Sequence, residues 1–478
     1  MNSVRLAILL SSLIASDSIW SQFYFAKTFG GALEDGGLCV AETHSGLFIA
    51  GGYTGSFGQG ASDAFLVVVN PLGWWQWEKT YGGPDVDRIN SIVWRGSLGY
   101  AVGFTKSNPD ANYIPWLLCI QDNGDTIFTR TYPGSSWSWF SSVVSGDSSL
   151  YLAGVSYDSI GRAFGAVWKL DTLGHVNWQA QFPQVGSEEV QFLDLCLLND
   201  SLMVVGGTTY TPSDLQAILV FFNRKTGELL YYDIFGNSAM EEYLTGLSFD
   251  GIKIWYCGYV VNPLNNRISP LIGSFLATTM TNQTAPYYFH PQFNNRYNDI
   301  FCTGPDDYAV ATSSQVIGLG LSLAAVLNYQ DDNFLWSTNL GVSGYNSANS
   351  ILRTSDNGFL IAGEISGTGP GLRALLIWKI DSLGQTVAQP SVQINEAASE
   401  ELFTILYRPE GLWINNKTGF LTGSALELFD LSGRLLYKLK SSELQTDIFI
   451  PRAILPGMGF LRYAEGSQCW VKKFVIVP

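Results

Sequence analysis

The chain repeats a short motif that ends in a turn, with KTFGG at residues 27–31, KTYGG at 79–83 and RTYPG at 130–134. The central residue of this motif recurs every 50 to 54 residues, as an aromatic side chain in six copies and as leucine in the seventh. These first anchors are Phe29, Tyr81, Tyr132, Phe182, Phe235, Phe289 and Leu340. A fixed period of this length is typical of propellers and other arrays of homologous units.

Two further features share the period. An apolar run ends in a small residue every 51 to 53 residues, at Gly52, Gly103, Gly154, Gly207, Gly258, Ala311 and Gly363. The segment VWKLDTLG at 167–174 returns as IWKIDSLG at 377–384. Three features with one period predict seven homologous units.

The residue pattern predicts four short strands in each unit. In the first unit, alternating apolar residues bounded by Gly, Asn, Asp and Pro predict strands near 37–42, 46–53, 63–70 and 74–81. A four-stranded unit of about 50 residues has the size of a propeller blade. We therefore expect an all-β chain, with a seven-bladed β-propeller over residues 23–394 followed by a small antiparallel β-sandwich.

The ring is expected to close through both ends of the propeller. The segment 23–29 has the phase of a fourth blade strand, so it should pair beside the strand near 374–381. Closure through residues 384–394 instead would leave the number of blades unchanged.

Composition limits the location and partners of the protein. Arg5 followed by an apolar run predicts a signal peptide over residues 1–22. The run is about half the roughly 20 residues needed to cross a bilayer, which disfavours the alternative of a membrane anchor. No later stretch is long and apolar enough to span a membrane. A formal net charge of -15 disfavours nucleic acid, which requires basic patches.

Catalytic and zinc signatures are weak. The cysteines have no paired spacing, and buried free thiols are the favoured interpretation for Cys39, Cys196 and Cys302. The three histidines form no metal or hydrolase motif, so no metal site and no catalytic residue are assigned. Enzymatic activity stays undecided, with binding favoured, because a glycosidase pair is defined by distance in space and not in sequence.

A polar residue follows each first anchor by six positions. This ring comprises Asp35, Asp87, Ser138, Glu188, Glu241, Asn295 and Asn346. On the connection into the innermost strand, these groups could line one channel mouth and bind a polyhydroxyl ligand or calcium, the only cofactor that the pattern suggests. The favoured alternative is that each residue accepts a backbone N–H in its own turn.

Aromatic residues also stand four positions before six of the seven first anchors, at Phe25, Trp77, Phe128, Trp178, Tyr231 and Trp336. Their constant phase favours packing between blades over sugar binding. Trp137 and Trp139 break the pattern beside a loop. They are therefore the aromatic ligand-binding candidates.

The residues after the propeller change in character. A polar linker at 395–401 precedes seven expected strands in 402–478, and this region contains LELFDLSGR at 426–434, LPGMGFLR at 455–462 and VKKFVI at 471–476. The three blocks, in this order, resemble the C-terminal (Por-type) sorting domain of Bacteroidota type IX secretion cargo. The propeller units likewise resemble the glycine-rich repeats of Bacteroidota propellers. The matching motif residues are Phe429, Asp430, Gly433, Arg434, Pro456, Gly457, Lys472 and Lys473.

The resemblance implies export through the type IX translocon, as a partner of the C-terminal domain, and a secreted, extracellular or outer-membrane-surface location. An ordinary accessory or adhesive sandwich is the alternative. For the propeller, we expect a binding protein for a glycan, a protein or a cell surface. A carbohydrate-active enzyme with an acidic pair at the channel mouth and a structural envelope component are the other hypotheses.

Overall fold

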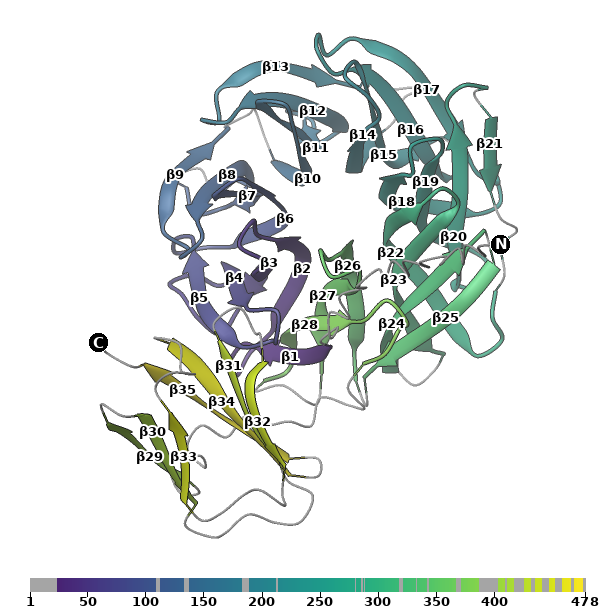
Figure 1. The fold of residues 1–478 in the computed structure, drawn as a ribbon. Coiled ribbons are helices and arrows are strands. Elements are labelled where there is room, and N and C mark those ends of the chain that lie inside the picture. The colour runs from purple at the N-terminus through teal and green to yellow at the C-terminus, as the bar shows by residue number, and fades with distance from the viewer. Residues whose placement is uncertain are drawn as a thin grey trace, which may run out of the picture.

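The computed structural model describes residues 24–386, apart from 109–111, 133–136, 183–188, 212–213, 280, 285–286, 288, 318–320, 332, 342–343 and 367–370, together with the strands that come after residue 402. The predicted signal peptide at 1–22 and the linker at 395–401 lie outside the described residues. Every regular element in the described part is a β-strand, and seven four-stranded sheets stand in a ring (Figure 1). The predicted all-β, seven-bladed propeller is confirmed.

Six blades are each formed by four consecutive strands. Blade 1 holds β2 (Asp35–Glu42), β3 (Phe48–Thr54), β4 (Asp63–Val69) and β5 (Trp75–Tyr81). Blade 2 holds β6 (Asp87–Arg95), β7 (Leu98–Thr105), β8 (Ile114–Gln121) and β9 (Thr126–Thr131). Blade 3 holds β10 (Ser138–Gly146), β11 (Ser149–Tyr157), β12 (Ala163–Asp171) and β13 (Val176–Gln181).

The next three blades repeat this order. Blade 4 holds β14 (Val190–Leu197), β15 (Leu202–Tyr210), β16 (Leu215–Asn223) and β17 (Leu229–Phe235). Blade 5 holds β18 (Glu241–Phe249), β19 (Ile254–Asn262), β20 (Arg267–Leu276) and β21 (Thr281–Thr284). Blade 6 holds β22 (Phe293–Gly304), β23 (Asp307–Val316), β24 (Leu321–Gln330) and β25 (Asn333–Leu340).

Blade 7 joins the two ends of the propeller. It holds β26 (Asn346–Arg353), β27 (Phe359–Ile365) and β28 (Ala374–Ile380), and its fourth strand is β1 (Phe25–Phe29). The pairing of β1 with β28 is antiparallel and runs from Phe25 opposite Lys379 to Phe29 opposite Leu375. The predicted closure through the first strand is confirmed.

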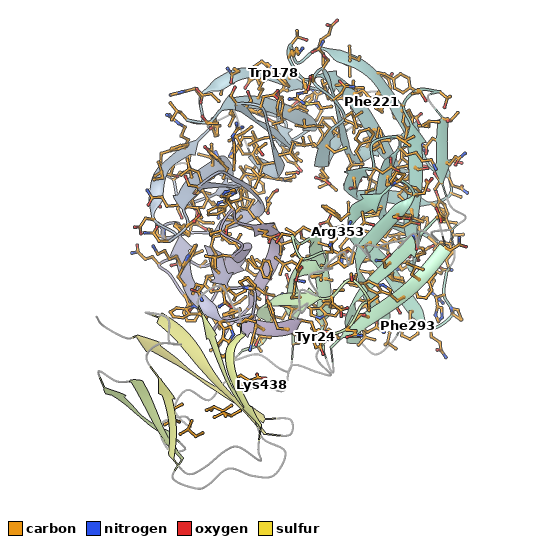
Figure 2. All side chains as sticks on the ribbon, in the orientation of Figure 1. Tyr24, Trp178, Phe221, Phe293, Arg353 and Lys438 are labelled. Carbon is orange, nitrogen blue, oxygen red and sulfur yellow. The ribbon has the colours of Figure 1, made fainter. Side chains whose placement is uncertain are left out.

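The blades are apolar on both faces, and their side chains fill the space between neighbouring sheets (Figure 2). All residues of β4, β27 and β28 are buried. The outermost strands β9 and β13 alternate between half-buried and exposed residues, because only one of their faces meets a neighbour. The short strands and their burial thus follow the sequence pattern blade by blade.

The aromatic residues before the first anchors pack between blades, as predicted. The ring of Trp77 in blade 1 lies against Gly124 in a turn of blade 2, and its Nε1 donates a hydrogen bond of 2.7 Å to the carbonyl of Asp122. Gly124 has a φ of 78°, which a side chain rarely adopts, and a Cβ there would collide with the indole. Trp178 and Trp336 meet equivalent glycines, Gly227 and Gly384.

The first anchors Tyr81 and Tyr132 reinforce the same contact. Tyr81 Oη donates to the carbonyl of Gly124 at 2.6 Å, and Tyr132 Oη donates to the carbonyl of Gly174 at 2.7 Å. These aromatic positions therefore join the outer part of blades 1, 2, 3 and 6 to a turn of the next blade.

Five cysteines of the propeller are free thiols. Cys39, Cys119 and Cys257 are buried, and Cys196 and Cys302 are half-buried. Burial raises the pKa of the Cys39 thiol to about 12, so this group packs as a neutral apolar side chain.

Two antiparallel sheets come after the propeller. One contains β29 (Phe403–Arg408), β30 (Gly411–Asn416) and β33 (Asp447–Pro451). The other contains β32 (Leu435–Lys440), β31 (Ala425–Asp430), β34 (Met458–Glu465) and β35 (Gln468–Val475). The packing of these sheets as a sandwich stays a prediction.

The sorting-motif residues fall partly on these strands. Phe429 and Asp430 end β31, while Lys472 and Lys473 lie in β35 opposite Leu461 and Phe460 of β34. The remaining motif residues, Gly433, Arg434, Pro456 and Gly457, lie outside the described part of the chain.

Closure through β1 predicts that the substitution Phe25→Ala lowers the free energy of unfolding by about 3–5 kcal/mol, the usual cost of emptying a buried phenylalanine site. Phe25 is 5% exposed and stacks on Phe48 of blade 1. Tyr24→Ala is the matched control, because Tyr24 is 40% exposed and its loss should change stability by about 0.5 kcal/mol or less. Urea unfolding followed by tryptophan fluorescence measures both, and equal losses would contradict closure through β1.

Candidate functional site

Each innermost strand carries a β-bulge at the same place. In all seven blades the strand pairing skips one residue, which is left without a partner on the neighbouring strand. These bulge residues are Leu38, Asn90, Ser141, Leu193, Thr245, Asn298 and Asn349. All except Asn298 line one shared central cavity, so the bulges aim these side chains toward the propeller axis.

Part of this ring forms hydrogen bonds from one blade to the next. Asn90 Nδ2 donates to the carbonyl of Phe140 at 2.8 Å, and Asn349 Nδ2 donates to the carbonyl of Gly37 at the same distance. Thr245 and Asn298 make the equivalent bonds to their next blades. The apolar bulge residues Leu38 and Leu193 cannot donate such a bond, and Ser141 Oγ is buried with no hydrogen-bond partner among the described residues.

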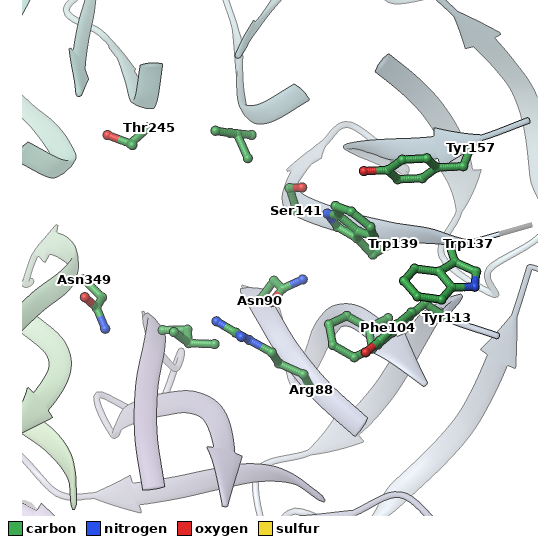
Figure 3. Close-up of a pocket in the computed structure, with 12 residues that line it drawn as sticks. Arg88, Asn90, Phe104, Tyr113, Trp137, Trp139, Ser141, Tyr157, Thr245 and Asn349 are labelled. Atoms are coloured by element: carbon green, nitrogen blue, oxygen red, sulfur yellow. The ribbon is translucent and has the colours of Figure 1, made fainter. Parts of the chain in front are cut away.

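The cavity at this ring has a volume of about 650 Å³, and most of the lining side chains labelled in Figure 3 come from blades 2 and 3. Beside the bulge residues, it is lined by Arg88, Phe104, Tyr113, Trp137, Trp139 and Tyr157. A concave site of this size, with aromatic walls and a few polar groups, is typical of small-ligand sites.

The two tryptophans predicted as ligand candidates both line this cavity. Trp137 is 51% exposed, and its ring meets Tyr113 edge-on, with centroids 5.0 Å apart. Tyr113 meets Phe104 in the same way at 4.8 Å, and Trp139 packs against Tyr157 at 5.6 Å. The contacts hold the rings in fixed orientations while leaving Trp137 open to a ligand.

Arg88 brings a positive charge to this cavity. It is the second residue of β6, and its side chain points into the cavity (Figure 3). The guanidinium carbon lies 5.3 Å from the ring centroid of Tyr53. Burial lowers the pKa of Arg88, although an arginine remains charged at physiological pH.

A pair of carboxylates stands directly after the bulge residues of blades 4 and 6. Asp194 accepts hydrogen bonds from Ser142 Oγ and from the backbone N–H of Leu247, and Asp299 accepts one from the N–H of Ile351. Burial disfavours the charged carboxylate and raises the pKa of Asp194 to about 6 and that of Asp299 to about 7. The charge of Asp194 adds to the shift of Asp299. Through these hydrogen bonds, both groups connect neighbouring blades.

The predicted polar ring contains turn caps. Asp35 is the first residue of β2 and has no exposed surface; its Oδ2 accepts the N–H of Gly31 and the hydroxyl of Ser56, both at 2.8 Å. Asp87 repeats these contacts with Gly83 at 2.8 Å and Ser107 at 2.7 Å. These carboxylates lie at the start of the strand and face their own blade.

The other ring positions vary. Ser138 donates to Ser156 Oγ, Asn295 accepts from Ser314, and Asn346 is buried and bonds Ser322. In blade 5 the cap is Glu242, which accepts the N–H of Asn237, while the predicted Glu241 is half-buried beside Tyr243. Glu188 lies outside the described residues.

Calcium binding by this ring stays a prediction. In the described ranges, no cluster of three or more His, Cys, Asp or Glu side chains has metal-binding geometry.

The described part of the chain contains no helix with the length and apolar character needed to cross a bilayer.

Sequence reasoning missed the other ten cavity residues, among them Arg88, Asn90, Phe104, Tyr113 and Tyr157. Arg88 directly follows the predicted Asp87, so alternation along β6 could have indicated it, since neighbouring side chains on a strand face opposite ways. The bulge that directs Asn90 has no local signal in a single unit.

No family model matches the chain, and no curated protein matches it. Among solved structures, YCF48 from Cyanidioschyzon merolae is similar, with 8% sequence identity, a TM-score of 0.40, and coverage of 74% of this chain and 98% of the other. A similarity at this level carries no argument about the site. The propeller assignment rests on the strand pairing of this chain.

The turn-cap contacts predict that Asp35→Ala and Asp87→Ala each lower the free energy of unfolding by about 2–3 kcal/mol, because buried donors to a charged acceptor lose their partner. Glu241→Ala, at the same repeat position but half-buried, should cost less than about 1 kcal/mol. Thermal unfolding with calcium and with a chelator measures these costs. A calcium-dependent stabilisation of the unmodified chain that disappears in the triple variant of Asp35, Asp87 and Glu188 would instead support a cation ring.

Proposed function

We propose that this chain is an extracellular binding protein whose propeller holds a glycan in the aromatic cavity at the channel mouth. The observation that carries the proposal is the half-exposed Trp137, which lines one cavity with Trp139, Tyr157 and the polar bulge residues Asn90, Ser141, Thr245 and Asn349. Flat aromatic rings pack on the C–H faces of pyranoses, and the polar bulge residues can bond their hydroxyl groups. The fixed ring orientations reduce the entropy lost on binding.

A glycosidase is the second candidate, and one observation favours it: the pKa of Asp299 near 7 suits a general acid. Hydrolysis also requires a second carboxylate on the other side of the scissile bond. Yet none of the residues that line the described cavity is Asp or Glu, and Asp194 and Asp299 accept backbone N–H bonds from the next blades. These contacts support binding over hydrolysis.

For export, we propose the type IX route, with the C-terminal region as the sorting signal and residues 1–22 as the signal peptide. The support is the resemblance of the three sequence blocks between 426 and 476 to that class of domain. The location of the protein outside the cell or on the outer-membrane surface is part of the same proposal.

The binding proposal predicts that Trp137→Ala and Trp139→Ala each weaken glycan affinity roughly tenfold, as expected for the loss of one stacking contact. The matched control is Trp75→Ala, because Trp75 is 57% exposed on the outermost strand β5 of blade 1. A glycan array followed by calorimetry, with the chain from residue 23 onward, gives the affinities. The proposal fails if the unmodified chain binds no glycan or if the three variants behave alike.

The export proposal predicts that deletion of residues 402–478 leaves the propeller in the periplasm, because the translocon would lack its recognition element. Cell fractionation with antibody detection locates the chain. Restoring 402–478 on the same propeller should restore release or surface display. Normal display of the truncated chain would rule out a sorting role.

A further inference from the structure

The cavity contains an arginine whose charge is not neutralised by an ion pair. Arg88 forms no hydrogen bond or ion pair among the described residues, and its Nε is buried without a partner. Arg373, another half-buried arginine of the propeller, instead pairs with Glu364 at 2.8 Å and also with Glu34. A buried donor without a partner is costly, so such a group calls for a ligand or ordered water.

A carboxylate that interacts electrostatically with Arg88 is already bound by other groups. Glu364 interacts electrostatically with Arg88, but its two oxygens accept hydrogen bonds from Arg373 Nη1 at 2.8 Å and from Tyr53 Oη at 3.2 Å. Tyr53 lies between the two charged groups, with its ring 5.3 Å from the guanidinium of Arg88. The fork of Arg88 donors therefore stays available to the cavity.

The surroundings of Arg88 suit a sugar unit. Trp139 and Tyr157 offer aromatic surface, and Ser141 Oγ is a second buried polar atom with no partner among the described residues. Asn90 uses its Nδ2 in the inter-blade bond, which leaves Oδ1 as an acceptor for a hydroxyl. A ligand that satisfies Arg88, Ser141 and Asn90 must combine an anionic group with hydroxyl groups.

We propose that the cavity selects a pyranose unit that carries one anionic group, carboxylate or sulfate, and that Arg88 binds this group through its guanidinium. The inference rests on the proposed glycan-binding function and specifies its ligand class. Guanidinium matches the geometry of such oxyanions with two parallel N–H donors. The overall charge of -15 opposes densely charged polyanions, so a sparsely charged glycan or a single acidic terminal unit is selected.

The test compares glycans with one backbone in neutral, carboxylated and sulfated forms, measured by calorimetry against the chain from residue 23 onward. Arg88→Gln should weaken binding of the acidic forms roughly tenfold to a hundredfold while changing the neutral form by about twofold or less. Arg88→Lys keeps the charge but not the fork and should give an intermediate loss. Arg95→Gln, at the other end of β6, removes the same charge away from the cavity and should have no effect.

The carboxylated and sulfated arms identify which anion is preferred, and either preference supports the proposal. An equal loss for neutral and acidic glycans in Arg88→Gln, with an unchanged melting temperature, would overturn it, as would a preference of the unmodified chain for the neutral form. In those two cases glycan binding itself survives. Binding of an acid-ended peptide with no binding of any glycan would overturn both this inference and the proposed function.

Discussion

The propeller depends on one constraint: each blade is a sheet with two apolar faces, and both must be covered. Every residue of β4, β27 and β28 is buried, which is possible only if a neighbouring sheet lies on each side. A linear stack would leave one apolar face exposed at each end, whereas a ring leaves none. The pairing of β1 with β28 fixes the last blade in this ring. The inter-blade bonds of Asn90 and Asn349 add polar contacts at the centre, where the sheets come closest.

The number and phase of the blades could be predicted because each repeated feature has a packing role. Tyr81 and Tyr132 recur since they bond the turn of the next blade, and the turn glycine recurs since an aromatic ring lies where its Cβ would be. Trp137 and Trp139 could be predicted as ligand-binding candidates because they fit no repeated packing position. Both line the cavity.

Spacing alone could not identify the residues that face the propeller axis. Asp35 and Asp87 are polar at a constant position, but each begins its innermost strand and faces its own blade, where it caps a turn. Strand alternation then directs Arg88, one residue later, toward the axis. The blade 5 cap moves to Glu242, a shift of one residue that a period of 50 to 54 residues cannot reveal. The bulges add a second reason why simple alternation fails, because one extra residue reverses the direction in which the later side chains of the strand point.

Closure through the first strand also sets an order of events during folding. Phe29 pairs with Leu375, so the earliest strand of the ring has no partner until a strand more than three hundred residues later has been synthesised. Contacts that join such distant positions form slowly, because the long intervening chain must first be ordered. The first six blades can assemble from consecutive strands while β1 remains unpaired and able to bind other strand edges. A chain that ends before β28 is complete would therefore keep an open ring with unpaired strand edges. Chaperones or proteases that recognise such edges could distinguish it from the closed propeller.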